Sequence, residues 1–164
     1  MPVVSNTSPL LNLAIIDKLH LLQREFGEIF IPEAVLNECR LNDNLPGTKD
    51  ISDALEKGWL IVKKTQNLSQ VLLLERELDK GEAEAIVLAI EHDANIILLD
   101  ERDARRYCQS IGLDMTGVLG ILLKAYLNGQ LKSIEKTLMD LKEKAGFYID
   151  DTLFRNIVDS AKPC

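Results

Sequence analysis

Four polar residues that lie far apart in the sequence have side chains able to bind a divalent cation: Asn6, Glu38, Glu82 and Asp100. All four carry oxygen ligands, which suit Mg²⁺ or Mn²⁺. Carboxylates gathered in one pocket repel one another unless a cation neutralises them. Such a cation activates water and stabilises charge on a phosphoryl oxygen. If the four residues meet, they predict hydrolysis of a phosphodiester bond, with Asp103, one helical turn beyond Asp100, as a further candidate ligand.

Glu82 stands on the apolar side of its helix. A rotation of about 100° per residue places it at the centre of the apolar arc of segment 81–91, whereas Glu84 and Glu91 fall on the opposite side, which is expected to face solvent. A carboxylate that faces a core needs a partner. The spacing of Asp79 and Glu82 permits a capping box, and this window alone favours that cap over a metal ligand.

Two of the other three candidates, Asp100 and Asn6, also have structural alternatives. On the helix that opens at Pro32, Glu38 is predicted to face inward with the apolar positions. Asp100 is a natural N-cap for the helix that follows it, and Asn6 could satisfy a backbone group. Each structural alternative explains its own residue, but explaining all four residues without a shared site requires four coincidences.

A regular alternation of predicted strands and helices positions the four candidate ligands. Short apolar runs predict strands at residues 3–5, 28–32, 59–65, 95–99 and 113–115. Helical periodicity lies between them and continues to the C-terminus, and residues 41–50 have the composition of a loop. The helix in residues 8–26 is expected to begin with Ser8 as cap and Pro9 in the first turn. The pattern predicts an α/β fold with a mostly parallel sheet covered on both faces.

The order of the elements predicts where the polar residues meet. In an open parallel sheet, functional groups gather beyond the carboxyl ends of the strands, where the strand order reverses. The first strand ends at Asn6 and the strand of residues 95–99 ends at Asp100, so both are expected at this edge. Glu82 opens a helix that enters from the same edge if the connection is right-handed.

Composition limits the class of protein. The 164 residues suit one domain, with a C-terminal helical extension at about 132–164, and no apolar run has membrane-spanning length. The N-terminus lacks the features of a signal peptide. The three widely spaced cysteines, Cys39, Cys108 and Cys164, indicate reduced thiols in a cytoplasmic protein and argue against structural zinc.

The formal net charge of −7 argues against a broad basic face for nucleic acid, so any such site must be local. Arg102, Arg105 and Arg106, directly after Asp100, are the strongest candidates, and Lys63 with Lys64 forms a second pair. The glycine patterns of dinucleotide-binding and P-loop proteins are missing from the sequence. The two histidines are isolated, which favours surface or boundary positions over catalysis.

Several segments resemble those of the PIN-domain ribonucleases, most closely the small prokaryotic branch whose chains begin with SNTSP or SDTSP. The matching segments are "VVSNTSPLLNL", "IPEAVLNE", "LDKGEAEAIVLAIEHDANIILLDERDARR" and "IGLDMTGVLGILLKAYLNG". They cover nearly the whole chain in the family's order and spacing. The resemblance implies a PIN-like three-layer α/β/α fold with a mostly parallel central sheet.

The resemblance also implies site residues. The second, third and fourth acids of the family fall on Glu38, Glu82 and Asp100, which favours metal ligation over capping for Glu82 and Asp100. The first acid falls on Asn6, whose amide ligates a cation without supplying charge, so weaker metal binding is expected. Thr7 and Ser8 match the family's hydroxyl residue and are interpreted first as helix-entry residues, then as groups that hydrogen-bond metal-bound water.

The function implied by the resemblance is a ribonuclease that uses Mg²⁺ or Mn²⁺, with the arginines holding RNA phosphates. It is typical of the toxin of a VapC-type toxin–antitoxin pair, with an antitoxin protein and a second copy of the chain as partners. The alternative is a catalytically inactive PIN-fold module that binds RNA or a partner protein, because Asn6 replaces an acid. Fold alone does not decide between the two.

Overall fold

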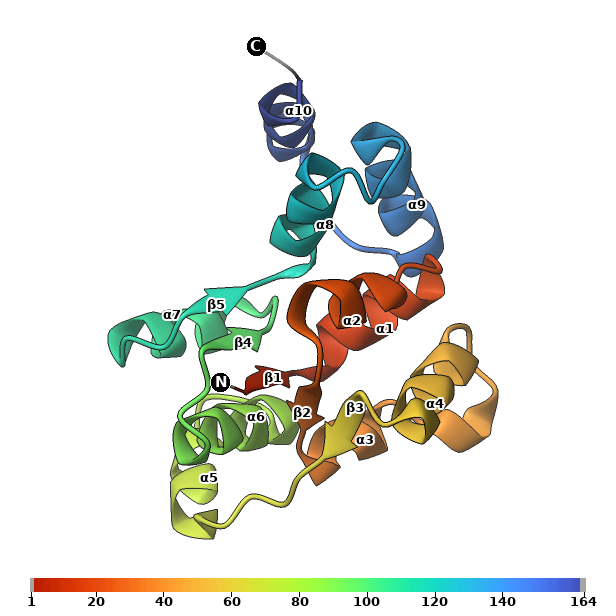
Figure 1. Ribbon diagram of the computed structural model, residues 1–164. Helices are drawn as coiled ribbons and strands as arrows, with labels where there is room; N and C mark the ends of the chain where they lie inside the picture. Colours follow the sequence, from red (N-terminus) through yellow and green to blue (C-terminus); the bar gives the residue numbers. More distant parts are fainter. Residues whose placement is uncertain (1, 163–164) are drawn as a thin grey trace.

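The computed structural model describes residues 2–162 and has a five-stranded sheet at its centre (Figure 1). The strand order is β3-β2-β1-β4-β5, and every pairing is parallel. The strands are β1 (Val3–Ser5), β2 (Ile29–Ile31), β3 (Leu60–Val62), β4 (Ile96–Leu98) and β5 (Met115–Thr116). The prediction of an α/β fold with a parallel sheet is therefore confirmed, and the strand order reverses beside β1, as in other doubly wound sheets.

Helices cover both faces of the sheet (Figure 1). They are α1 (Thr7–Ile15), α2 (His20–Phe26), α3 (Glu33–Glu38), α4 (Thr48–Lys57), α5 (Leu68–Leu74), α6 (Lys80–Glu91), α7 (Arg102–Ser110), α8 (Val118–Leu127), α9 (Ile134–Ala145) and α10 (Asp151–Ser160), with a 3₁₀ turn, η1 (Leu41–Asp43).

Two buried apolar clusters lie on opposite faces of the sheet. Because side chains alternate along a strand, Val3 packs into one cluster and its neighbour Val4 into the other. The first cluster includes side chains from α1, α4, α8, α9 and α10, and the second includes α5, α6 and α7. The fold thus has three layers, α/β/α.

The N-terminal helical segment differs from its prediction. The helix begins at Thr7, so Asn6 holds the N-cap position and Ser8 lies inside the first turn; the assignment of Ser8 as cap is wrong. Residues 8–26 also form two helices instead of one, because Asp17 adopts a left-handed φ of 61° between α1 and α2. The shift of the helix start frees the Ser8 hydroxyl for a tertiary contact.

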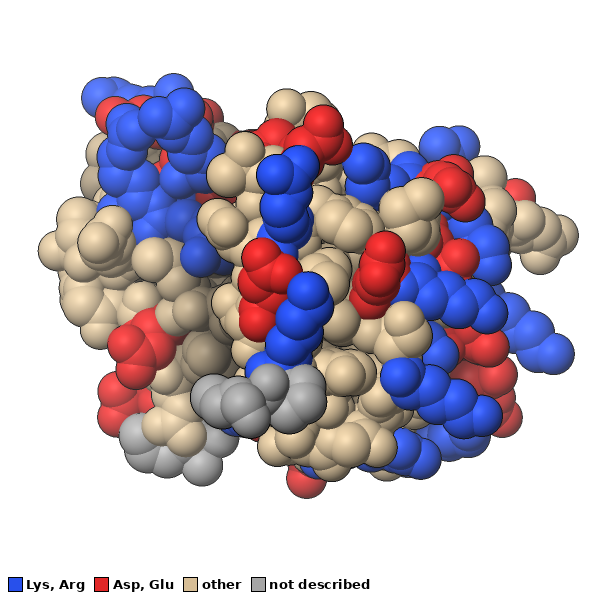
Figure 2. Space-filling model, turned by 90° about the horizontal axis from the view of Figure 1, so that it is seen from above, with Lys and Arg blue, Asp and Glu red and all other residues tan. Residues whose placement is uncertain are grey.

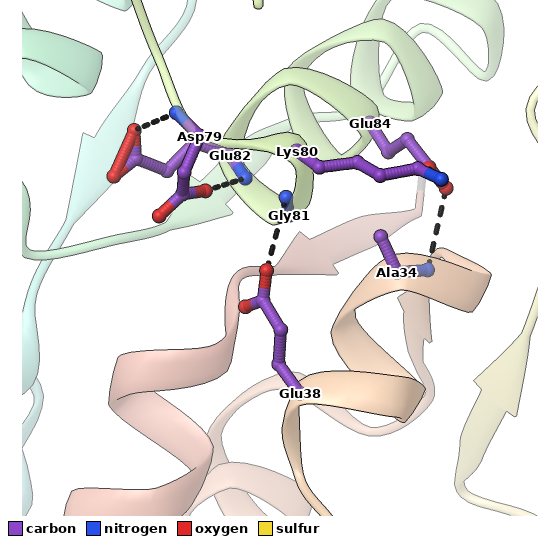
Figure 3. Close-up of polar contacts among 7 residues, drawn as sticks. All are labelled: Ala34, Glu38, Asp79, Lys80, Gly81, Glu82 and Glu84. Carbon is purple, nitrogen blue, oxygen red and sulfur yellow. Dashed lines mark hydrogen bonds and ion pairs between the residues drawn. The ribbon is translucent and has the colours of Figure 1, made fainter.

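Glu84 is not on a solvent-facing side. It is 8% exposed and accepts a hydrogen bond from the backbone N–H of Ala34 at 3.3 Å. The cause is that α3 packs along the first turns of α6 and covers Glu84 there (Figure 3). Glu91, by contrast, is exposed as predicted and accepts hydrogen bonds from the backbone of Gln66 and Asn67.

Cys39 and Cys108 are buried free thiols, as the spacing predicts, whereas Cys164 lies outside the described residues. Burial raises the pKa of Cys39 to about 12 and that of Cys108 to about 11, which makes both unreactive at neutral pH. Within residues 2–162, every helix is too short or too polar to span a lipid bilayer.

Candidate functional site

The carboxyl ends of β1 and β4 are side by side, and they place Asn6 and Asp100 at the same edge of the sheet. The backbone N–H of Asn6 donates to the carbonyl of Leu98 at 2.8 Å, which extends the pairing of these strands. Asn6 is 3% exposed, and its Oδ1 has no hydrogen-bond partner among residues 2–162. Asn6 therefore does not use its oxygen to satisfy a backbone group, and a buried oxygen of this kind requires water or a cation.

Glu38 is held by groups from two other elements. Its Oε2 accepts a hydrogen bond from the hydroxyl of Thr7, and its Oε1 accepts one from the backbone N–H of Gly81 at 3.1 Å (Figure 3). Glu38 is exposed and so is not buried with the apolar positions of its helix, but its carboxylate points to the first turn of α6 (Figure 3).

Gly81 is the residue that permits this approach. A Cβ at this position would lie 2.6 Å from Oε2 and 2.7 Å from Cδ of Glu38, closer than real Cβ contacts allow. The absence of a side chain at Gly81 lets the carboxylate reach the N-terminus of α6, where backbone N–H groups favour negative charge.

Asp100 accepts hydrogen bonds from two elements. The backbone N–H of Val118, in the first turn of α8, donates to Oδ1 at 2.9 Å, and the hydroxyl of Ser8 donates to Oδ2 at 3.3 Å. Asn12 in turn donates from Nδ2 to the Ser8 oxygen at 3.0 Å. Asp100 is therefore not the N-cap of α7, as one alternative predicts; Glu101 holds that position.

Burial raises the pKa of Asp100, while the hydrogen bonds from Val118 and Ser8 and the charge of Arg105 act in the opposite direction. The net shift of the Asp100 pKa is upward, so the surrounding protein does not fully offset the cost of burying the ionised carboxylate. A bound cation would supply the missing compensation.

Glu82 forms the predicted capping box with Asp79. Its backbone N–H donates to Asp79 Oδ1 at 2.8 Å, and its Oε2 accepts from the backbone N–H of Asp79 at 3.4 Å (Figure 3). Burial, followed by repulsion from Asp79, raises the pKa of Glu82 to about 7. The capping interpretation is thus confirmed.

A further carboxylate, Glu101, belongs to this edge of the sheet. Burial raises its pKa, and repulsion from Asp100 and Asp79 adds to the shift. The sequence patterns do not single out Glu101, although its position directly after Asp100 is a signal that it shares the same surroundings. The acidic edge therefore extends from Asp100 through Glu101 and Asp79 to Glu82.

The candidate ligands fall into separate hydrogen-bonded groups. One joins Glu38 to Thr7, and the other joins Asp100 to Ser8. Across residues 2–162, no group of three or more His, Cys, Asp and Glu side chains is arranged so that it could hold a metal ion. Asp103 is exposed and lines a different hollow.

The three arginines after Asp100 do lie together. A surface hollow of about 540 Å³ is lined by Asp100, Arg102, Arg105, Arg106, Gln109 and Met115. Lys63 instead lies over the ring of Phe30, 5.0 Å from its centroid, and Lys64 lines a hollow beside α5. Of the two basic candidates, only the arginines border an acidic residue of the candidate metal site.

Replacing Glu82 by glutamine is expected to stabilise the metal-free protein more at pH 8 than at pH 5. Because its pKa in the folded protein is raised from 4.5 to about 7, the stability that Glu82 contributes is present below pH 4.5 and is lost as the pH rises through 7, by at most about 3 kcal/mol. The glutamine side chain does not ionise. Thermal unfolding in EDTA is expected to show the variant melting about 3–6 °C above the wild type at pH 8. A difference between the two proteins that stays constant from pH 5 to pH 8 would contradict this prediction.

Comparison with known proteins places this geometry in a family. A search of curated proteins finds no match to the chain. The model of the DUF3368 family, described as a PIN domain, matches residues 2–163, nearly the whole sequence. PIN domains are generally nucleases and generally use divalent metal ions. The parallel sheet with Asn6 and Asp100 at the carboxyl ends of its central strands is therefore that of a PIN domain, and the chain belongs to the PIN-domain family.

Proposed function

We propose that the protein is a metal-dependent endoribonuclease. The observation that carries the proposal is the buried Oδ1 of Asn6, which has no hydrogen-bond partner within residues 2–162 and lies on the strand edge that also carries Asp100. A buried amide oxygen beside a carboxylate whose pKa is raised by burial is a suitable environment for a hard cation.

The proposed ligands of Mg²⁺ or Mn²⁺ are Asn6, Glu38, Glu82 and Asp100. All four offer oxygen atoms, so the donor chemistry fits the ion. Glu38 and Glu82 accept hydrogen bonds from the backbone N–H groups of Gly81 and Asp79, and each carboxylate keeps further lone pairs that can bind the ion. When bound, the ion activates water and stabilises charge on the phosphate. Asp103 is left out of this set because it lines another hollow.

The chain's own residues position the acids and the substrate. The hydroxyls of Thr7 and Ser8 fix the orientations of Glu38 and Asp100 by donating to their carboxylates. In this proposal Glu38, Glu82 and Asp100 are the catalytic residues, and the arginines of α7 hold RNA phosphates beside them, because guanidinium groups match phosphate geometry.

The toxin role is a finer proposal that rests on the SNTSP start and the other segments resembling VapC-type proteins. In this role, an antitoxin protein would block the acidic edge, the chain would form a homodimer, and the protein would act in the cytoplasm.

Two observations favour a second function, an inactive binding module on the PIN scaffold. Asn6 supplies no negative charge at the position of the family's first acid, and the carboxylates of residues 2–162 do not form a three-membered metal-binding group. Such a module would hold RNA or a partner protein at the same edge without cleaving it.

Cleavage of a mixed-sequence fluorescent RNA by the partner-free protein separates the two functions. In parallel reactions with Mn²⁺, Mg²⁺ and EDTA, the nuclease proposal predicts internal cleavage with either metal and none with EDTA. Circular dichroism of each sample controls for folding. An intact RNA in all three reactions, with folded protein, would refute the nuclease proposal for this substrate and favour the binding module.

A further inference from the structure

Helix α8 begins at the acidic edge without a side chain of its own to cap it. Its N-cap residue is Gly117, and the backbone N–H of Val118, in the first turn, donates to Oδ1 of Asp100 at 2.9 Å. By contrast, α6, α9 and α10 are capped by the side chains of their own N-cap residues. The carboxylate that follows β4 therefore takes the place of a cap for a helix that begins 18 residues later.

The space beside Gly117 is filled by the segment that joins β4 to α7. A Cβ added to Gly117 would lie 3.0 Å from Nη1 of Arg105 and 3.3 Å from the carbonyl oxygen of Leu99. It would lie closer still to Oδ1 of Asp100, at a separation that real Cβ atoms essentially never show. A side chain at position 117 would therefore push the Asp100 carboxylate out of its place.

Backbone conformation does not require glycine at this position. Gly117 has φ −113° and ψ −175°, in the extended region that other residues adopt without strain, whereas six other glycines have a positive φ. Serine, threonine, asparagine and aspartate are the usual residues at an N-cap with this conformation. The missing side chain is thus explained by the space that Asp100 occupies and not by backbone strain.

Glu38 is held in the same way at α6. The backbone N–H of Gly81 donates to its Oε1 at 3.1 Å, and a Cβ on Gly81 would overlap the carboxylate. Two acids from different elements therefore each reach the first turn of a helix past a glycine. For Asp100 the arrangement is costly, because burial raises its pKa, and a side-chain cap at position 117 would avoid that cost. A costly arrangement that occurs twice at one edge favours a role in orienting the acids.

We propose that Gly117 is a positioning residue of the acidic edge, which by lacking a side chain lets α1 and α8 hold Asp100 in one orientation. The inference rests on the proposed function, because the orientation matters to the reaction only if Asp100 takes part in it. Val118 holds Oδ1, and the hydroxyl of Ser8 holds Oδ2 at 3.3 Å. A methyl group at position 117 displaces Oδ1 and turns the carboxylate between these donors. A misplacement of about 1 Å costs roughly a hundredfold in rate.

Two substitutions of Gly117 separate positioning from capping. Gly117→Ala displaces Asp100 and leaves α8 without a cap. Gly117→Ser also displaces Asp100 but gives α8 a hydroxyl that can accept from the backbone N–H of Gly120, as N-cap serines do. A purely structural role therefore predicts that serine restores full activity, whereas a positioning role predicts that the serine variant is folded and slow.

Gly120→Ala is the matched control, because it makes the same change three residues later in α8. A Cβ at Gly120 would have only the side chain of Thr116 within 4 Å, and its nearest atom is a hydroxyl that can rotate away. Figure 2 shows Lys and Arg side chains interspersed with Asp and Glu side chains on the face seen from above. Since none of the three substitutions changes a charge, a difference in rate cannot come from a change in this charge distribution.

The test combines RNA cleavage with a measurement that does not depend on activity. In Mn²⁺, Gly117→Ala and Gly117→Ser are each expected to lower the saturating single-turnover rate by roughly a hundredfold, with the half-saturating RNA concentration within about twofold of the wild type. In EDTA, the Val118 amide, followed by NMR, is expected to exchange its hydrogen at least about tenfold faster in both variants, since it loses a charged acceptor. Gly120→Ala should match the wild type in every measurement, and circular dichroism controls for folding.

The inference is overturned if Gly117→Ser cleaves as fast as the wild type, if Gly120→Ala loses as much activity as Gly117→Ala, or if Val118 exchange is unchanged in the Gly117 variants. If the wild type never cleaves RNA but Val118 exchange rises only in the Gly117 variants, the nuclease proposal fails and the placement of Asp100 by Gly117 stands. If the wild type and both Gly117 variants cleave RNA equally well, the positioning role fails and the nuclease proposal stands.

Discussion

Asp100→Asn is expected to reduce RNA cleavage in Mn²⁺ by about a hundredfold to a thousandfold while the protein remains folded. Asparagine keeps an oxygen that accepts the hydrogen bond from Val118, so the start of α8 retains its cap. It removes the negative charge from the acid that follows the central strand β4, and the loss of one electrostatic group in an active site has an effect of this order. Single-turnover cleavage of the fluorescent RNA measures the rate.

Asp114→Asn is the matched control for this substitution. Asp114 is an exposed aspartate just before β5, at the opposite end of the strand from the acidic edge, so its loss removes the same charge away from the site. Its cleavage rate is expected to equal that of the wild type. If Asp100→Asn cleaves as fast as Asp114→Asn, Asp100 is not a catalytic residue.

Asn6→Asp is expected to strengthen the binding of Mn²⁺ and to increase RNA cleavage, whereas Asp100→Asn reduces cleavage. A carboxylate at this buried position adds negative charge beside Asp100, so Mn²⁺ should bind about tenfold more tightly or better, and cleavage should rise. Without metal, the added charge is buried and repelled, so the melting temperature in EDTA should fall by several degrees. Calorimetric titration of Mn²⁺ and thermal unfolding with and without the ion measure both effects.

Asn95→Asp controls for the charge, because Asn95 is exposed and precedes β4 at the other edge of the sheet. It should change neither metal affinity nor activity. If Asn6→Asp becomes active while the wild type is inactive, Asn6 is the reason that this chain is a binding module. If Asn6→Asp binds Mn²⁺ and still cleaves no RNA, the nuclease proposal is damaged and the binding module remains.

The backbone arrangement was predictable from local patterns. Apolar runs end at Ser5 and at Leu99, and a parallel sheet brings the ends of neighbouring strands together, so the shared edge of Asn6 and Asp100 follows from the sequence. The capping box between Asp79 and Glu82 also follows, because it depends on residues only three apart. Both features can be predicted because they depend only on residues within one element or on the order of the elements along the chain.

Other features depend on contacts between distant segments and were not predictable in this way. Helical periodicity separates the two sides of α6 but does not reveal that α3 packs against the side that carries Glu84, which is why Glu84 is buried. The same limit applies to Ser8, whose partner Asp100 is 92 residues away. The environment of Glu101 likewise arises from Asp79, which approaches only in the folded chain.

The hydrogen bonds that join Asn12, Ser8 and Asp100 all donate in one direction, from Asn12 to Ser8 and from Ser8 to Asp100. An ionised Asp100 only accepts, so the Ser8 proton points toward it, and the Ser8 oxygen is left to accept from the nitrogen of Asn12. Position 12 must therefore donate. Aspartate there, the product of deamidation and nearly identical in shape, would compete with Asp100 for the single Ser8 proton, so the hydrogen bond from Ser8 to Asp100 depends on the amide nitrogen of Asn12.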